Sequence, residues 1–434
     1  MKEVQISKVL AIQNFGSSGS KFVHSLFDNH PDILAIPSLY MLSFYSFWPE
    51  DKSRNTFQVI DNFVNHFKFW FDKNGYPPYG TDKMGVNRNE KIFIEKDVFK
   101  KNLKEKLINH KEVRRNYFIQ CVYLSYAKSF GRDLKKEINK YIILYPHHTS
   151  NPKYAKELIN DFKDVRFLYV FREPLQALGS SMKLVSTRWG GFVHRKTTAE
   201  YGFNMFLNDR YISDKNPYKI YAYSKISNVP CVGIRLEDLV ENPNNILMKF
   251  CKWLNLDWSE ELLESTYNGK IWWNRPESAE VSGFSNVPLL NKHKDIFFKL
   301  DKLRLDYLFS KIKSELGYDI IKSKYKLFTI CILILFPFKI ELLSIFPSKI
   351  SFHKSSLFFK NFKPILNKIV HSKSLKKTGL KILFNEIIKY LISFVTLVPI
   401  FSYLRVRFLL YKTIFRVKNT NFKYNVVKVI NLDD

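Results

Sequence analysis

A strand, a turn rich in glycine and serine, and a helix follow one another in the first thirty residues and constrain the fold more than any other segment. The apolar run 8–13 is typical of a buried strand, the turn holds Gly16 and Gly19, and residues spaced for a helix follow from Lys21. The first N–H groups of a helix have no partner within it, so such a turn indicates an anion site. The expected phosphate-binding residues are Gly16, Ser17, Ser18, Gly19, Ser20 and Lys21.

The same turn lacks the metal ligand of nucleoside triphosphate loops. In those loops Gly-Lys precedes a Ser or Thr whose hydroxyl ligates Mg²⁺. Here Lys21 follows Ser20 and precedes Phe22. The pattern therefore favours phosphate bound without magnesium, and no spacing of metal ligands is found elsewhere in the chain. A kinase or nucleotide triphosphatase is the alternative, and it predicts ATP binding that depends on magnesium.

A second apolar run, 165–171, ends at Arg172 and is followed by Pro174 and a helix. Proline is favoured in the first turn of a helix because its missing N–H costs nothing there. The planar guanidinium of arginine makes two charge-assisted hydrogen bonds to one phosphate. Arg172 is therefore a second candidate phosphate ligand at the end of a strand.

Together these segments resemble the sulfotransferase family, whose members take a sulfuryl group from 3′-phosphoadenosine 5′-phosphosulfate. The loop of that family is usually a basic residue, then Ser-Gly-Thr-Thr, then a helix ending near His-Pro-Asp or His-Pro-Glu. Residues 18–20 match its core and 26–32 match the end of its helix. Ser17 stands in place of the basic residue and Lys21 in place of the second hydroxyl. The resemblance makes Lys21 a candidate for a displaced positive charge that assists transfer.

The resemblance extends to two further regions and assigns more residues to the nucleotide. The family binds the 3′-phosphate with an arginine at a strand end, followed by a proline two residues later and a serine eight residues later, and Arg172 and Ser180 keep that spacing. Strand 231–234 with its Glu237-Asp238 pair resembles a framework segment of the family. The lid that closes over the nucleotide corresponds here to Asn268, Gly269 and Lys270.

The general base is placed by the same resemblance. One branch of the family has a glutamate after its second strand, where this chain has no carboxylate. Another branch has a histidine just past the third strand, where this chain has His147 and His148. Imidazole accepts a proton near neutral pH. We expect His148, or else His147, to be the base, with Asp82 and Glu90 as the next candidates.

These segments predict an α/β fold, a three-layer sandwich with a central parallel sheet and a nucleotide-binding core of the P-loop kind. A sulfotransferase-like domain is expected at 1–320, with a helical insert at about 57–132 that shapes the acceptor site. Scattered cysteines favour a reducing compartment. The expected parallel strands are 8–13, 33–36, 141–145, 165–171 and 231–234.

The C-terminal region 321–434 has a different composition. Residues 322–434 hold 21 lysines and arginines and four acidic residues, a net charge of +17. The whole chain has a net charge of +29. Its apolar runs are shorter than the roughly 20 residues that span a bilayer. We expect a basic, mainly helical region that lies on an anionic membrane surface. An ordinary helical subdomain is the alternative, and nucleic acid is not an expected partner.

The resulting prediction is transfer of a sulfuryl group to a hydroxyl or amine of an acceptor. The acceptor is a glycan, a glycolipid or a small hydroxylated molecule, and the basic C-terminal region favours the first two. A membrane-associated adaptor that keeps the fold without catalysis is a further alternative. The first residues lead directly into a strand and show no secretion signal. This favours the cytoplasm, with peripheral contact to the inner face of a membrane.

Overall fold

The structure is a computed structural model and describes residues 8–14, 17–48, 55–108, 113–132, 141–144, 152–188, 229–274, 281–290, 297–319 and 428–430. The chain divides into two compact units. The first unit holds a β-sheet and most of the described helices. The second holds α7 (Pro174–Arg188) and α12 (Lys299–Glu315), which pack on each other.

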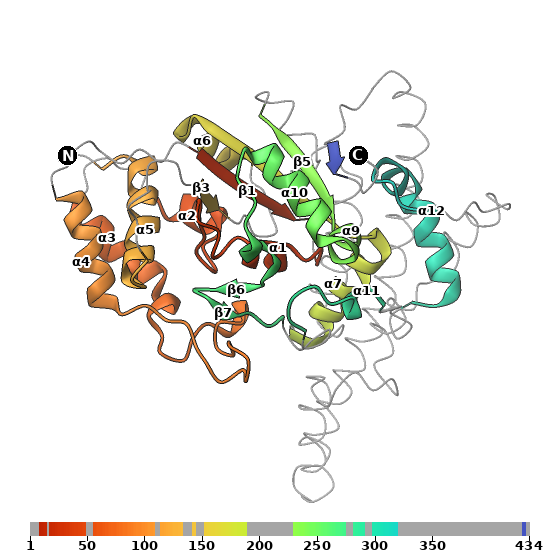
Figure 1. Ribbon diagram of the computed structural model, residues 1–434, viewed down its shortest axis with the longest axis horizontal. Coiled ribbons are helices and arrows are strands. Elements are labelled where there is room, and N and C mark those ends of the chain that lie inside the picture. Colours follow the sequence, from red (N-terminus) through yellow and green to blue (C-terminus); the bar gives the residue numbers. More distant parts are fainter. Residues whose placement is uncertain are drawn as a thin grey trace, which may run out of the picture. The chain divides into compact units, whose positions relative to one another are not determined.

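A parallel sheet of six strands forms the centre of the first unit, in the order β2-β3-β1-β4-β5-β8 (Figure 1). β1 lies between β3 and β4, so the carboxyl ends of these three strands meet at one edge. The strands are β1 (Lys8–Asn14), β2 (Ile33–Leu34), β3 (Tyr141–Leu144), β4 (Asp164–Phe171), β5 (Cys231–Arg235) and β8 (Lys428–Ile430). The five expected strands are confirmed, with ends that differ by one or two residues. β8 comes from the C-terminal region and was not predicted.

Helices cover both faces of the sheet, as the buried apolar strands require. On one face Leu10, Ile12 and Val170 share a core with α1 and α10. On the other face Ala11 and Phe167 are buried, and α6 contacts β4. The three-layer α/β arrangement is therefore confirmed. The helices of this unit are α1 (Ser20–Ser25), α2 (Met41–Phe47), α3 (Thr56–His66), α4 (Lys96–Leu107), α5 (Arg115–Ser129), α6 (Pro152–Asp161), α9 (Leu236–Glu241), α10 (Pro243–Leu254) and α11 (Val287–Leu290), with 3₁₀ helices at Lys68–Phe71, Pro77–Tyr79 and Glu260–Leu263.

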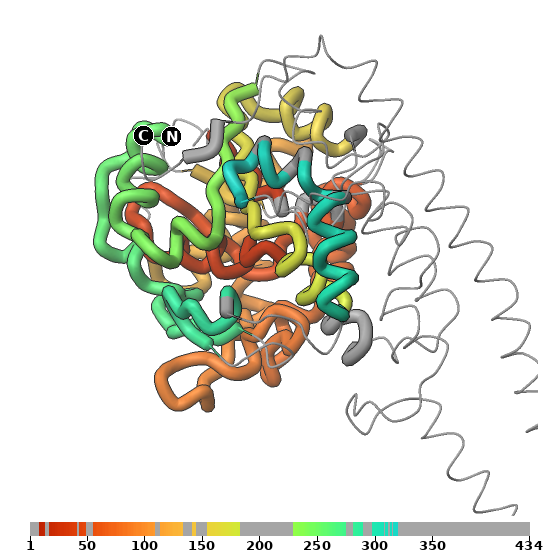
Figure 2. Tube along the Cα trace, turned by 90° about the vertical axis from the view of Figure 1, so that its right-hand side faces the viewer, coloured from red at the N-terminus to blue at the C-terminus, as the bar shows by residue number. Residues whose placement is uncertain are grey.

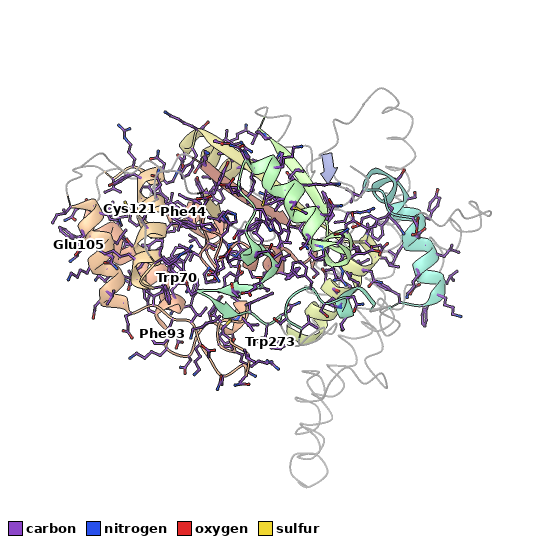
Figure 3. All side chains as sticks on the ribbon, in the orientation of Figure 1. Phe44, Trp70, Phe93, Glu105, Cys121 and Trp273 are labelled. Carbon is purple, nitrogen blue, oxygen red and sulfur yellow. The ribbon has the colours of Figure 1, made fainter. Side chains whose placement is uncertain are left out.

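The helical insert between β2 and β3 is held together by aromatic side chains (Figure 3). Phe63 of α3 lies 5.5 Å from Phe118 of α5 and 5.6 Å from Trp70, measured between ring centroids, with the rings edge to face. Phe44 of α2 stacks on the same Phe118 ring at 6.5 Å. Such pairs add about 0.5–1.5 kcal/mol each beyond burial. The insert thus has a core of its own beside the sheet.

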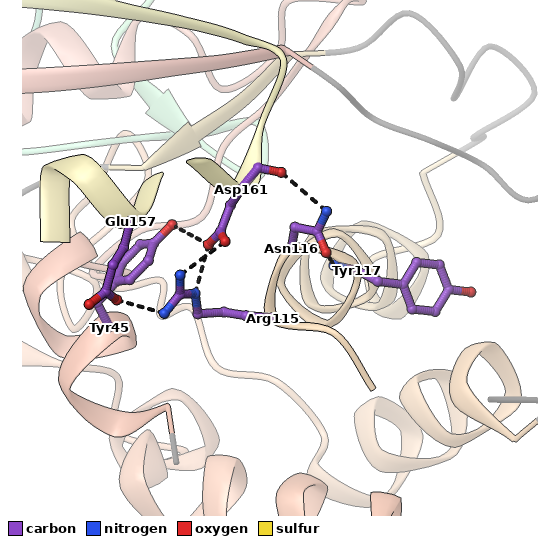
Figure 4. Close-up of polar contacts among 6 residues, drawn as sticks. All are labelled: Tyr45, Arg115, Asn116, Tyr117, Glu157 and Asp161. Carbon is purple, nitrogen blue, oxygen red and sulfur yellow. Dashed lines mark hydrogen bonds and ion pairs between the residues drawn. The ribbon is translucent and has the colours of Figure 1, made fainter. Parts of the chain in front are cut away.

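An ionic cluster joins the insert to α6 (Figure 4). The Arg115 guanidinium of α5 donates to both carboxylate oxygens of Asp161 at 2.7 and 2.9 Å and to Glu157 at 2.6 Å. The Tyr45 hydroxyl of α2 donates to the same Asp161 at 2.9 Å, and the guanidinium lies over the Tyr45 ring. Three helices therefore meet at one arginine.

A short antiparallel hairpin, β6 (Thr266–Tyr267) and β7 (Lys270–Ile271), lies beside the loop part of the insert (Figure 2). The Gly85 N–H donates to the Ile271 carbonyl at 2.9 Å, and the Trp272 indole donates to the Tyr79 carbonyl at 2.9 Å. The hairpin and residues 76–94 are thus one packed region, although about 180 residues separate them in sequence.

Within the described ranges, no helix is both long and apolar enough to cross a bilayer. Apart from β8, the basic region 321–434 lies outside the described residues. Its expected helices and its contact with a membrane stay predictions, as do the domain boundaries drawn from the sequence.

Candidate functional site

The turn after β1 has the backbone geometry of a tight loop. Ser17 has φ of 46° and Gly19 has φ of 89°, immediately before α1 begins at Ser20. The positive φ of Gly19 favours glycine there, and a Cβ would lie 2.8 Å from Leu236 Cδ1, so the end of that side chain would have to shift. The side chains of Ser18 and Ser20 are buried. Of the predicted loop residues, Gly16 alone lies outside the described part.

Arg172 lies at this loop. It follows β4, the strand next to β1, and is 6% exposed. Its Nη1 donates to the Ser17 carbonyl at 3.2 Å, and its Nη2 donates to the Pro288 carbonyl of α11 at 2.6 Å. Two motifs that the sequence predicted separately, 155 residues apart, are therefore joined by a hydrogen bond.

Lys21 extends toward the insert. Its ammonium donates to the Pro78 carbonyl at 3.0 Å and lies 5.0 Å from the centre of the Tyr79 ring. A cation over an aromatic face at this distance is stabilising. The charge of Lys21 is thus placed on the side of the loop that faces the insert, where the acceptor is expected.

Beneath the loop, His24 of α1 forms a buried cluster with two tyrosines. Its Nδ1 lies 2.8 Å from the Tyr267 hydroxyl and 3.1 Å from the Tyr79 hydroxyl, and the two hydroxyls lie 3.2 Å apart. Burial lowers the pKa of His24 to about 3, so the imidazole is neutral at physiological pH. The cluster connects the loop helix, the insert and the hairpin.

The predicted lid residues form the turn of the hairpin. Asn268 and Gly269 have φ of 48° and 70°, the pair of left-handed residues that a two-residue hairpin turn requires. The Gly269 N–H donates to the buried Asp28 carboxylate at 3.0 Å, and the Asn268 amide donates to the Tyr126 hydroxyl at 2.8 Å. Burial raises the pKa of Asp28, and its hydrogen bonds only partly offset this. The turn is thus anchored to the end of the loop helix.

Lys270, the third predicted lid residue, forms an ion pair with Glu90 of the insert at 2.7 Å. Both side chains are partly exposed, so the pair contributes little to stability, and the ammonium can change its partner for another anion at little cost. Lys270 therefore meets a carboxylate of the insert in this structure, and its contact with the nucleotide stays a prediction.

Ser180 lies in α7, part of the second unit, and His147 and His148 lie outside the described residues. β3 ends at Leu144 beside β1, so the histidines follow a strand that adjoins the loop strand. Glu237 lies in the first turn of α9, which begins at Leu236, while Asp238 binds Arg235 through two hydrogen bonds of 2.7 Å, which fits the predicted framework role. In the described part, no group of three or more His, Cys, Asp or Glu residues could hold a metal ion.

The sequence did not identify five of the partners in this region, because each contact spans a long stretch of chain and no local pattern marks it. They are His24, Asp28, Tyr79, Tyr126 and Pro288. The nearest signal was the aromatic composition of segments 76–79 and 123–126, which also suits an ordinary core. What the arrangement offers chemically is a tight loop of backbone donors, one nearly buried guanidinium beside it, and a lysine facing the insert.

Three solved structures show low similarity to this chain. A sulfotransferase domain from the curacin biosynthetic pathway is 14% identical, with a TM-score of 0.36, covering 73% of this chain and 100% of that one. A sulfotransferase of Mycobacterium tuberculosis H37Rv is 13% identical, with a TM-score of 0.32, covering 60% and 70%. A sulfotransferase domain of the Synechococcus PCC 7002 olefin synthase is 14% identical, with a TM-score of 0.32, covering 74% and 100%.

No curated protein sequence matches the chain. The profile of the sulfotransferase family, in contrast, matches residues 15–260, more than half of the chain. The matched segment includes the loop, Arg172 and the framework strand β5. This chain belongs to the sulfotransferase family.

Proposed function

We propose that this chain transfers a sulfuryl group from 3′-phosphoadenosine 5′-phosphosulfate to a hydroxyl or amine. The observation that carries the proposal is the hydrogen bond between Arg172 and the Ser17 carbonyl. It brings a guanidinium suited to one phosphate group to a loop whose backbone suits another. A nucleotide with phosphate groups on both its 3′ and 5′ sides requires two such positions.

In this reaction the acceptor oxygen or nitrogen attacks sulfur, and the bond between sulfur and the bridging 5′-phosphate oxygen breaks. The products are the sulfated acceptor and 3′,5′-phosphoadenosine. Negative charge grows on the bridging oxygen, so donors already fixed around it favour the transition state. We assign this role to the backbone N–H groups of residues 18–21, with Lys21 assisting from the side of the insert.

The acceptor must also lose a proton. We assign His148 as the base, with His147 as the alternative, because an imidazole titrates in the right range. His24 is unsuited to this role, because burial lowers its pKa to about 3 and its Nδ1 contacts two tyrosine hydroxyls. Asp82 and Glu90 of the insert are the next candidates.

A glycan or glycolipid is the acceptor class we propose, with the basic region 321–434 holding the enzyme at the inner face of an anionic membrane. The support is compositional, since lysines interleaved with short apolar runs suit a charged bilayer surface. The cytoplasm is the proposed location. A lipid-linked acceptor would be presented at that surface.

Ligand-dependent thermal unfolding tests the proposal. A ligand that binds the native state alone raises the melting temperature. We expect 3′,5′-phosphoadenosine to stabilise the chain without metal and ATP with magnesium to have no effect. The reverse result would indicate a nucleotide triphosphatase or kinase. No response to either ligand would favour the membrane-associated adaptor that keeps the fold without catalysis.

A further inference from the structure

A cluster of three charged residues, Glu173, Asp306 and Lys313, lies in the second unit, where α7 and α12 pack together, and the last two of them are buried. The Lys313 ammonium binds the carboxylate of Asp306, which lies two turns earlier on α12. It also lies 3.1 Å from the Glu173 carboxylate. The side chains of Lys313 and Asp306 are 9% and 3% exposed. Desolvation alone would lower the pKa of Lys313, but its two carboxylate partners outweigh burial and raise it.

Glu173 also shapes the start of α7. Its second carboxylate oxygen accepts the Gln176 N–H at 2.8 Å, which satisfies one of the free donors in the first helical turn. Pro174 occupies the first helical position. One carboxylate thus caps α7 with one oxygen and meets α12 with the other.

The contact between Lys313 and Glu173 matters because of where Glu173 lies in the chain. Glu173 directly follows Arg172, and Ser180 lies two turns further along α7. Both of these neighbours are proposed ligands of the nucleotide. A helix that fixes Glu173 therefore restricts the segment from which they project.

We propose that Lys313, held by Asp306, is a positioning residue that fixes Glu173 and the first turn of α7, and through them the nucleotide ligands on either side. The inference rests on the proposed function for its effect on nucleotide, and on the observed cluster alone for its effect on α7. α12 thereby helps to hold the nucleotide ligands in place. It lies beyond residue 260, where the family profile ends.

Three variants of the full-length chain test this, with a matched control. Glu173→Gln keeps an oxygen for the Gln176 N–H but removes the charge that Lys313 binds. Lys313→Met removes the ammonium, and Lys313→Arg restores the charge. Lys299→Met, an exposed position on the same helix, is the control for substitution on α12.

We expect hydrogen exchange of the α7 amides to rise by about tenfold or more in Glu173→Gln and in Lys313→Met, the size expected for losing a charge-assisted contact. The dissociation constant of 3′,5′-phosphoadenosine should rise by at least about fivefold in the same proteins, as measured by calorimetry well below their melting temperatures. Lys313→Arg should restore most of both, and Lys299→Met should change neither. Recovery by the conservative variant separates positioning from general loss of stability.

Unchanged α7 exchange in a folded Glu173→Gln protein would overturn the inference. So would faster α7 exchange with unchanged nucleotide affinity, since the cluster would then be structural only. If the unmodified chain binds no 3′,5′-phosphoadenosine, the proposed function fails and the nucleotide role with it, while the exchange comparison still decides whether α12 fixes α7.

Discussion

Arg172 places a positive charge in a nearly buried position, where two backbone carbonyls accept its hydrogen bonds. These two carbonyls orient the guanidinium at the carboxyl end of β4, beside the loop. A guanidinium held in this way gains more from a phosphate than an exposed arginine does, because most of its desolvation has already taken place.

Replacing Arg172 by alanine should weaken binding of 3′,5′-phosphoadenosine by at least about 2 kcal/mol, through loss of the charge-assisted hydrogen bonds. Ser180→Ala should act in the same direction with a smaller effect. Calorimetry measures both. Arg166→Ala, at the other end of the same strand, is the control and should leave affinity unchanged. Equal affinity in wild-type and Arg172→Ala proteins would remove Arg172 from the site.

His148→Ala should lower turnover by about 10²-fold or more and leave nucleotide affinity nearly intact, because a general base acts on the transition state. Single-turnover assays with labelled donor measure the first effect and calorimetry the second. If His147→Ala shows the loss instead, the assignment moves by one residue. If neither does, a carboxylate of the insert is the base.

His24 makes stability depend on pH. Its pKa is about 3 in the folded chain, lowered by burial, and near 6.5 when unfolded. Between these values the unfolded state binds the proton and the folded state does not, so stability falls as pH falls through this window, by up to about 1.4 kcal/mol per pH unit. Denaturant unfolding at several pH values measures this. His24→Gln, which cannot titrate, should flatten the dependence, and an unchanged slope would assign it to other groups.

At the scale of elements, local sequence patterns predicted where the strands lie. The same patterns did not predict the contacts between segments that are far apart in the chain. Residues 9–12 and 167–171 form nearly continuous apolar runs, which are typical of strands buried on both faces, so β1 and β4 could be located. Asn242, of a residue type common at helix N-caps, precedes Pro243 at the first position of α10, and the Asn242 side chain caps this helix. Nothing local indicates that Lys270 meets Glu90 or that Lys21 meets Pro78, because those contacts depend on how the insert folds back.

The ionic cluster between α5 and α6 gives a prediction at this scale. Arg115→Met should destabilise the chain by about 2 kcal/mol or more, because Asp161 and Glu157 lose a partly buried partner that binds both. Lys128→Met, which breaks an exposed pair between the same insert helix and α4, should have little effect. Denaturant unfolding compares the two. Similar losses in both variants would show that burial of Arg115 adds nothing.

At the scale of the whole molecule, β8 shows that the C-terminal region belongs partly to the catalytic fold. Its three residues pair with Val232, Gly233 and Ile234 of β5, at the edge of the sheet. The charge asymmetry of residues 322–434 marked this region as a separate segment, and a three-residue strand within it carries no sequence signal strong enough to reveal the pairing. The effect of the basic charge of this region and the effect of the pairing between β8 and β5 therefore have to be separated by experiment.

Two shortened chains separate them. A chain ending at residue 319 loses both the basic region and β8, whereas a chain ending at residue 427 loses β8 and keeps nearly all of the charge. Both should unfold at lower denaturant than the full chain, because the edge of β5 loses its backbone hydrogen bonds. Both should still bind 3′,5′-phosphoadenosine, since the loop and Arg172 are retained.

Sedimentation with anionic vesicles then tests the membrane proposal on the same three proteins. The full chain and the chain ending at 427 should sediment with vesicles at low salt and be released as salt rises, because attraction between lysines and anionic lipid is screened while insertion is shallow. The chain ending at 319 should stay in solution. Equal sedimentation of all three would contradict a membrane role for the basic region, and aggregation of the shortest chain without vesicles would show that this region instead completes the core of the protein.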